Sequence, residues 1–260
     1  MIVLSDEIFM TKLSEFLLLS VRLAALLVAA PVLAASAVSV PIRVALTMAI
    51  TVVLMNVVPV PRVDLMGING VMLILSEALI GITIGLIFQL AFSAIAVAGE
   101  QMALSMGLGF ASMVDPQSGT QSPVVTQFLS IMLTLIFLVI GGHHVMLQHL
   151  AASYKTMPIG APFDIALSIG VVRAAALIFS AALIIAVPVL VTLFLVNLII
   201  GLMTRVSPQM NIFSIGFPVT IMVGFVVILI SIPSITNGMS GLIEAVSSIT
   251  RDLILTGGPR

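Results

Sequence analysis

Long apolar runs separated by short polar breaks dominate the sequence. Six runs are long enough to form helices that cross or line a membrane, and they cover residues 16–35, 42–58, 71–99, 124–140, 165–203 and 212–232. A bilayer core is about 30 Å thick, so a helix of roughly 20 apolar residues spans it. The pattern therefore predicts an all-α integral membrane protein, and no clean internal repeat is visible.

Two of the runs are longer than a bilayer core requires. A helix over 71–99 reaches about 43 Å, and the run 165–203 is longer still. Pro188 lies near the middle of that second run without a turn signal around it, so one kinked helix is expected there rather than two short ones. A polar connector is expected at 149–164, and a short amphipathic tail is expected after residue 232.

The break at 109–123, GFASMVDPQSGTQSP, carries one charge, two prolines and two glycines. A catalytic aspartate, a substrate site, a turn and a movable gate are all candidate interpretations. An intramembrane aspartyl protease needs two aspartates that share a site, and no second aspartate lies in an apolar run. Pro116 stands where a serine-protease motif around Ser118 would need glycine. Asp115 is therefore expected to accept backbone N–H bonds in an Asp-Pro turn.

Composition supports the membrane class. Hydrophobic residues make up 61% of the chain, charged residues 7%, and the mean hydropathy is +1.35, whereas soluble domains carry about 25% charged residues. A net charge of −1 gives nucleic acid no basic surface. The absence of cysteine excludes disulfides, thiolate metal sites and cysteine nucleophiles. Tryptophan is absent and Tyr154 is the single tyrosine, so an interfacial aromatic belt is almost missing and protein neighbours are expected around the chain.

Ionisable residues stand within the apolar runs or at their ends. They are Arg22, Arg43, Glu77, Glu100, Arg173 and Arg205. A charge that faces lipid at a helix centre costs at least about 2.5–3.5 kcal/mol, so these side chains should face protein or water. Internal pairs and snorkelling to the interface are the simplest arrangements. Four arginines against two glutamates leave two positive charges without a partner, and some are expected to pair with carboxylates or helix ends of other subunits.

Enzyme chemistry is not expected. His143, His144 and His149 lack the spacing of ligands on one helix face, and no phosphate-binding glycine loop is present, so no catalytic, cofactor or metal site is predicted. The first apolar run resembles a signal peptide only in its small residues, because acidic residues precede it and Arg22 interrupts it; a retained helix is expected. Orientation in the membrane stays open, because the charged residues of the loops are sparse.

The second break, RVSPQMNIFSIGFP, has a different expected role. Its arginine can approach helix-terminal carbonyls, and its prolines and glycine shape a tight reversal between the last two long runs. We assign this break to subunit packing through Arg205, Pro208, Gly216 and Pro218. A secondary transporter with discontinuous helices at 109–123 and 204–218 is the alternative interpretation of the two breaks.

Two long motifs resemble a known family. GEQMALSMGLGFASMVDPQSGTQSPVV (99–125) and GLMTRVSPQMNIFSIGFPVTIMVG (201–224) are similar to the signature regions of the FliR/SctT family, the R component of the flagellar and type III secretion export gate. Supporting matches lie at 30–50, 77–100 and 149–160, so the resemblance covers nearly the whole chain. GGHH departs from the family pattern by one extra histidine, His144. The closeness of DPQSGTQSPV favours the flagellar system over an injectisome.

The resemblance implies a fold and a set of partners. One R copy would join about five P-type and four Q-type subunits in a helical cone of tilted hairpins, within the basal body of the flagellum at the bacterial inner membrane. Residues 7–164 would form a P-like part and residues 165–250 a Q-like helical hairpin. Unfolded export substrates would pass through the centre, driven by the proton-motive force and an ATPase of other components.

The resemblance also implies a role for the first break. In the family, the loop after the third long helix closes the resting pore, and here that loop is 110–122, called the plug segment below. Its candidate residues are Phe110, Ser112, Met113, Asp115, Pro116, Gln117, Ser118, Gly119 and Gln121. Most residues of the plug segment are small or polar and only one is charged, so the segment can lie in a wet pore without a fixed ionic partner.

Overall fold

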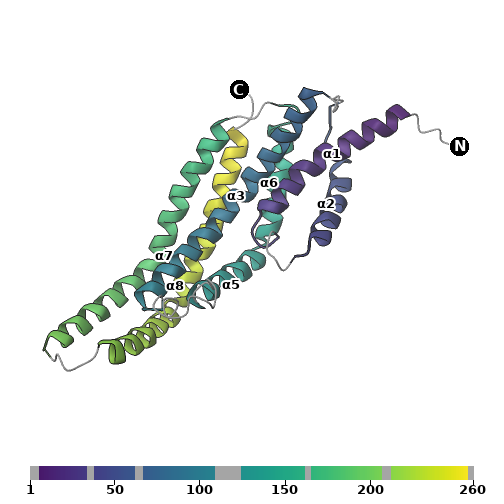
Figure 1. The fold of residues 1–260 in the computed structure, drawn as a ribbon. Coiled ribbons are helices and arrows are strands. Elements are labelled where there is room, and N and C mark those ends of the chain that lie inside the picture. The colour runs from purple at the N-terminus through teal and green to yellow at the C-terminus, as the bar shows by residue number, and fades with distance from the viewer. Residues whose placement is uncertain are drawn as a thin grey trace. The chain divides into compact units, whose positions relative to one another are not determined.

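The computed structural model describes residues 6–33, 38–61, 67–108, 124–161, 165–206 and 212–256, and these residues are helical apart from short turns (Figure 1). The helices of the described residues are α1 (Asp6–Ala29), α2 (Val40–Leu54), α3 (Ile68–Ser105), α5 (Val124–Val139), α6 (Gly142–Thr156), α7 (Ile165–Val206) and α8 (Ile212–Thr256). The predicted all-helical class is confirmed.

Several helices are long and apolar enough to cross a membrane. Within the described ranges these are Ile68–Ser105, Ile169–Val206 and Gly216–Leu255. Helices α5 and α6 meet the same criterion together, although the chain bends by 63° between them. The bend falls at Gly141, whose φ of +76° is a conformation that glycine adopts without a steric penalty. The part of the chain that the structure describes therefore has three such helices, or four if the bent pair counts as one span.

Helix α6 corrects one prediction. The sequence was expected to form a polar connector from 149 to 164, but helix continues there to Thr156. Its buried residues follow the spacing of one helical face: Met146, His149, Leu150, Ser153 and Tyr154. Histidine, glutamine and lysine between these positions lower the mean hydropathy, which hides an amphipathic helix from a search for uniformly apolar runs.

Helix α8 corrects a second prediction. A separate tail was expected after residue 232, whereas α8 is one helix of 45 residues that continues through Pro233 to Thr256. Helix α7 is continuous with Pro188 inside it, so the prediction of one helix rather than two is confirmed. The second break is shorter than expected, since α7 continues to Val206 and α8 begins at Ile212.

The helices form two compact units. The first consists of Met1–Leu90, Gly141–Ala175 and Ala245–Arg260. In it α1 packs closely on α3 at Gly81 and Gly85, which form a GxxxG pattern. A Cβ at Gly81 would collide with the carbonyl oxygen of Arg22, and one at Gly85 would lie 2.9 Å from that of Leu26. Small residues at this spacing let two helix backbones approach each other.

The second unit consists of Ala91–Ile140 and Ala176–Glu244. Its α3 residues pack on α5 at Gly99, where a Cβ would lie 2.8 Å from the Cα of Thr126. Helices α7 and α8 lie alongside each other here, with Gly238 against Ile185. These units are defined by packing, whereas the P-like and Q-like parts are defined by resemblance; the latter division stays a prediction.

Candidate functional site

A fully buried arginine joins three helices of the first unit. Arg22 of α1 donates from Nε to Oε2 of Glu77 in α3 at 2.6 Å, and from Nη1 to the hydroxyl of Ser153 in α6 at 3.0 Å. Its Nη2 donates to the carbonyl of Met157 at 3.0 Å, just beyond α6. The guanidinium also lies 4.3 Å from the ring centroid of Tyr154, which adds a cation–π contact. We call Arg22, Glu77, Ser153 and Tyr154 the Arg22 cluster.

The Arg22 cluster is built to hold helices rather than to react. All three guanidinium nitrogens have an acceptor, and the phenol of Tyr154 donates to the carbonyl of Leu19 at 3.1 Å. Oε1 of Glu77 is buried without a hydrogen-bond partner among the described residues. A buried ion pair is costly to break, since removal of one partner leaves an uncompensated charge. The cluster therefore fixes how α1, α3 and α6 pack.

The other predicted charges are arranged differently. Glu100 on α3 and Arg173 and Arg205 on α7 are exposed, and none of them forms an ion pair with the part of the chain that the structure describes. Arg43 on α2 is half-buried and makes an interaction. The structure thus brings together one pair of the six expected residues, Arg22 and Glu77. Pairing of the exposed arginines with other subunits stays a prediction.

The histidines do not converge. His143 and His144 have ring nitrogens 3.0 Å apart, while the Nε2 of His149 lies 3.0 Å from the hydroxyl of Ser247 in α8. His149 also packs beside Phe88 of α3. Across the described residues no group of three or more His, Cys, Asp or Glu side chains could hold a metal ion. His149 instead joins α6 to α8 in the first unit.

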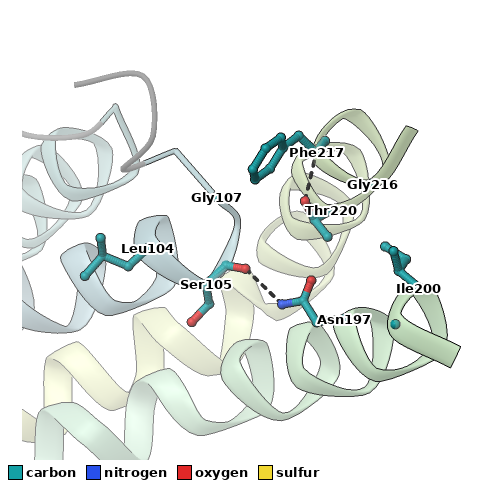
Figure 2. A pocket seen from close by; sticks show the side chains of 9 residues that line it. Leu104, Ser105, Gly107, Asn197, Ile200, Gly216, Phe217 and Thr220 are labelled. Carbon is teal, nitrogen blue, oxygen red and sulfur yellow. Dashed lines mark hydrogen bonds between the residues drawn. The ribbon is translucent and has the colours of Figure 1, made fainter. Parts of the chain in front are cut away.

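The end of α3 lies in the second unit, directly before the plug segment. Its last turn, together with α7 and α8, lines a cavity of about 250 Å³ (Figure 2). The lining includes Ser105, Asn197, Gly216 and Thr220. Gly216, predicted as a packing residue, is buried here, whereas Pro218 is exposed.

Some predicted site residues lie outside the described residues. They are Phe110, Ser112, Met113, Asp115, Pro116, Gln117, Ser118, Gly119 and Gln121 of the plug segment, and Pro208 of the second break.

Sequence reasoning missed several residues that organise these sites. Ser153 and Tyr154 were placed in a connector, and the GxxxG pattern at Gly81 and Gly85 was overlooked. Asn197 stands alone in the apolar sequence LFLVNLIIGL, and that isolation was an available signal. A polar side chain in such a run needs a hydrogen-bond partner when it packs against protein.

Together these features define an all-helical integral membrane protein with a buried ionic cluster, exposed apolar helices and isolated exposed charges. The sequence matches the family described as bacterial export proteins, family 1, over residues 13–246. The chain belongs to this family of FliR/SctT export proteins, and it is a component of the flagellar export apparatus of the bacterial inner membrane.

Relatives named flagellar biosynthetic protein FliR are similar over most of the chain. The protein of Pectobacterium carotovorum subsp. carotovorum is 37% identical over 242 residues, which is 93% of each chain. The protein of Escherichia coli K12 is 32% identical over 98% of each chain. The protein of Bacillus subtilis is 28% identical and covers 83% of this chain and 85% of its own length.

Proposed function

We propose that the chain is a channel-forming subunit of the flagellar protein export gate and lines the path of unfolded substrates. In this proposal one copy assembles with about five P-type and four Q-type subunits. Family membership supports the export role, and the helix surfaces support the assembly. The function requires no catalytic group of this chain, because the protein supplies a path rather than a reaction.

One observation carries the proposal of a multi-subunit assembly: exposed charges on helices apolar enough to span a membrane. Glu100 lies in Ile68–Ser105, and Arg173 lies in Ile169–Val206. A charge that faces lipid costs at least about 2.5–3.5 kcal/mol at a helix centre. Glu100 and Arg173 lie near an end of their helices, where this cost is smaller, but both side chains still need water or a polar neighbour. Neighbouring protein or a wet pore removes that cost, since either supplies counter-charges or water.

The extent of exposed apolar surface supports the same assembly. In the most apolar 18-residue stretch of α7, only 17% is buried within the chain, and in that of α8 only 22% is buried. Almost no tryptophan or tyrosine is available to anchor these helices at a lipid interface. Such surfaces fit a subunit enclosed by other apolar helices.

We further propose that the plug segment closes the pore when no substrate passes. The resemblance and the polar, nearly uncharged sequence support this role. The described helices on either side support it too, because α3 and α5 pack together at Gly99 and Thr126. The plug segment therefore connects neighbouring helices of one unit, which is the connection that the proposed plug requires.

Deletion of Ser112–Thr120 tests this function. The expected result is a complex that assembles at normal yield but leaks small ions, measured as ion flux in vesicles that contain the purified complex. Asp115→Asn is the matched control, because asparagine also forms the turn before proline, and it should stay as tight as the unmodified complex. A deletion that prevents assembly, with no leak from the residual complexes, would show a purely structural turn.

A further inference from the structure

The C-terminus of α3 is finished with a Schellman motif. Gly107 has a φ of +82°, its N–H donates to the carbonyl of Leu104 at 3.0 Å, and the N–H of Leu108 donates to that of Ala103 at 3.0 Å. This pair of bonds satisfies carbonyls that a helix end otherwise leaves free. The left-handed conformation at Gly107 is strained for residues with a Cβ.

Two side chains from other helices satisfy the remaining carbonyls. The Nδ2 of Asn197 in α7 donates to the carbonyl of Ser105 at 3.2 Å (Figure 2). The hydroxyl of Thr220 in α8 donates to the carbonyl of Met106, also at 3.2 Å, and shares its hydrogen with the carbonyl of Phe217 in its own helix. With the bond from the N–H of Met106 to Met102, every carbonyl from 102 to 106 accepts a hydrogen bond.

Close packing fixes the same turn against α8. A Cβ at Gly107 would lie 2.7 Å from the ring of Phe217, and the buried side chain of Met106 fills the space above Gly224. Phe217, Thr220 and Gly224 follow the spacing of one helical face. The last turn of α3 is thus held by two hydrogen bonds, a required glycine and two tight contacts.

We propose that Gly107, Asn197 and Thr220 are positioning residues that fix the place and direction in which the chain leaves α3. We call these three residues the α3 anchor. Met106 is fully buried, so water does not reach its carbonyl, and the donor from α8 lets the chain turn away from α3 at this place. The consequence for ion flux rests on the proposed function, since the plug segment starts two residues beyond Leu108.

Hydrogen exchange of the assembled complex tests the anchor without reference to the plug segment. Thr220→Val keeps the shape of the side chain and removes its hydroxyl, so the amides of Gly107 and Leu108 should exchange about three- to tenfold faster, as expected for the loss of one net hydrogen bond. Thr220→Ser should restore slow exchange. Thr236→Val is the matched control, because the hydroxyl of Thr236 donates within its own helix, to the carbonyl of Ile232.

Ion flux through the same variants then separates the anchor from the plug. Faster exchange with a leak in Thr220→Val and Asn197→Leu, and a tight Thr220→Ser complex, supports the anchor as a positioning device. Unchanged exchange overturns the anchor, and so does failure of both variants to assemble while Thr236→Val assembles. If exchange rises without a leak, and deletion of Ser112–Thr120 does not leak either, the anchor holds and the proposed plug is wrong.

Discussion

Among the described residues, Arg22 is a fully buried charge that forms an ion pair with Glu77. Its side chain is fully buried within an apolar helix and bonds to Glu77, Ser153 and the carbonyl of Met157. In a dry interior a guanidinium without a counter-charge loses its hydration and gains nothing in return. The packing of α1 therefore depends on the bonds from Arg22 to α3 and α6. A substitution of Arg22 or Glu77 should lower the stability of the fold.

Arg22→Ala should destabilise the chain by about 3–5 kcal/mol, because Glu77 is left buried without its counter-charge. The double variant Arg22→Leu, Glu77→Leu should recover most of that loss, since no charge remains unpaired. Unfolding of the detergent-solubilised protein measures both. Lys12→Ala is the control, because the exposed Lys12–Glu15 pair should contribute less than about 1 kcal/mol. If the single and the double variant lost the same stability, the ion pair would itself be stabilising. The loss in Arg22→Ala would then not come from leaving Glu77 without a partner.

Among the helices, α3 is contacted by α1 and α6 in the first unit and by α5, α7 and α8 in the second. Arg22 and the GxxxG pattern bind α1 to its first half, and the α3 anchor fixes its end. Its glycines at 81 and 85 contribute close backbone contact rather than flexibility. Their effect on stability therefore depends on what lies opposite each glycine, not on helix propensity alone.

Gly81→Ala should destabilise by about 1–3 kcal/mol, because the new methyl group meets the backbone of α1 and α1 must move. Gly241→Ala should stabilise by about 0.5–1 kcal/mol, since a Cβ there meets open space and alanine favours helix. Thermal unfolding in one detergent compares the two. A Gly81→Ala variant as stable as Gly241→Ala would contradict the close α1–α3 contact.

The elements also show what the sequence could predict. Apolar runs located α3, α5 and α7 because each is uniformly hydrophobic over its length. Helix α6 was missed because its apolar positions occupy a single face. The sequence identified Arg22 and Glu77 as expensive charges, but their pairing across 55 positions follows from how the helices pack, which no local pattern specifies. For the same reason, the sequence did not predict that Asn197 and Thr220 bond to backbone carbonyls at the end of α3.

For the whole molecule, the exposed apolar surface and the exposed charges on it are the features that predict partner subunits. Large apolar side chains cover α7, and Arg173 and Arg205 stand exposed among them. A second subunit that offers a carboxylate or a helix C-terminus would satisfy both the apolar area and the charge. The arginines are thus expected to determine which neighbour binds and in which register.

Arg173→Glu should lower recovery of partner subunits during purification at least several-fold, because it places two negative charges together at the contact. Arg173→Lys should retain the partners, since the positive charge remains. If a carboxylate-to-arginine substitution in a partner subunit restored binding to the Arg173→Glu variant, it would identify the contact. Recovery by a charge reversal elsewhere in this chain would show an internal pair instead and contradict the intersubunit assignment.

Extraction of the unmodified protein in mild detergent, followed by imaging of the purified particle, tests the proposed assembly. We predict a hetero-oligomer with one copy of this chain among about five P-type and four Q-type subunits. A monomer or homo-oligomer that catalyses substrate-dependent uptake into liposomes would contradict it and would establish a transporter.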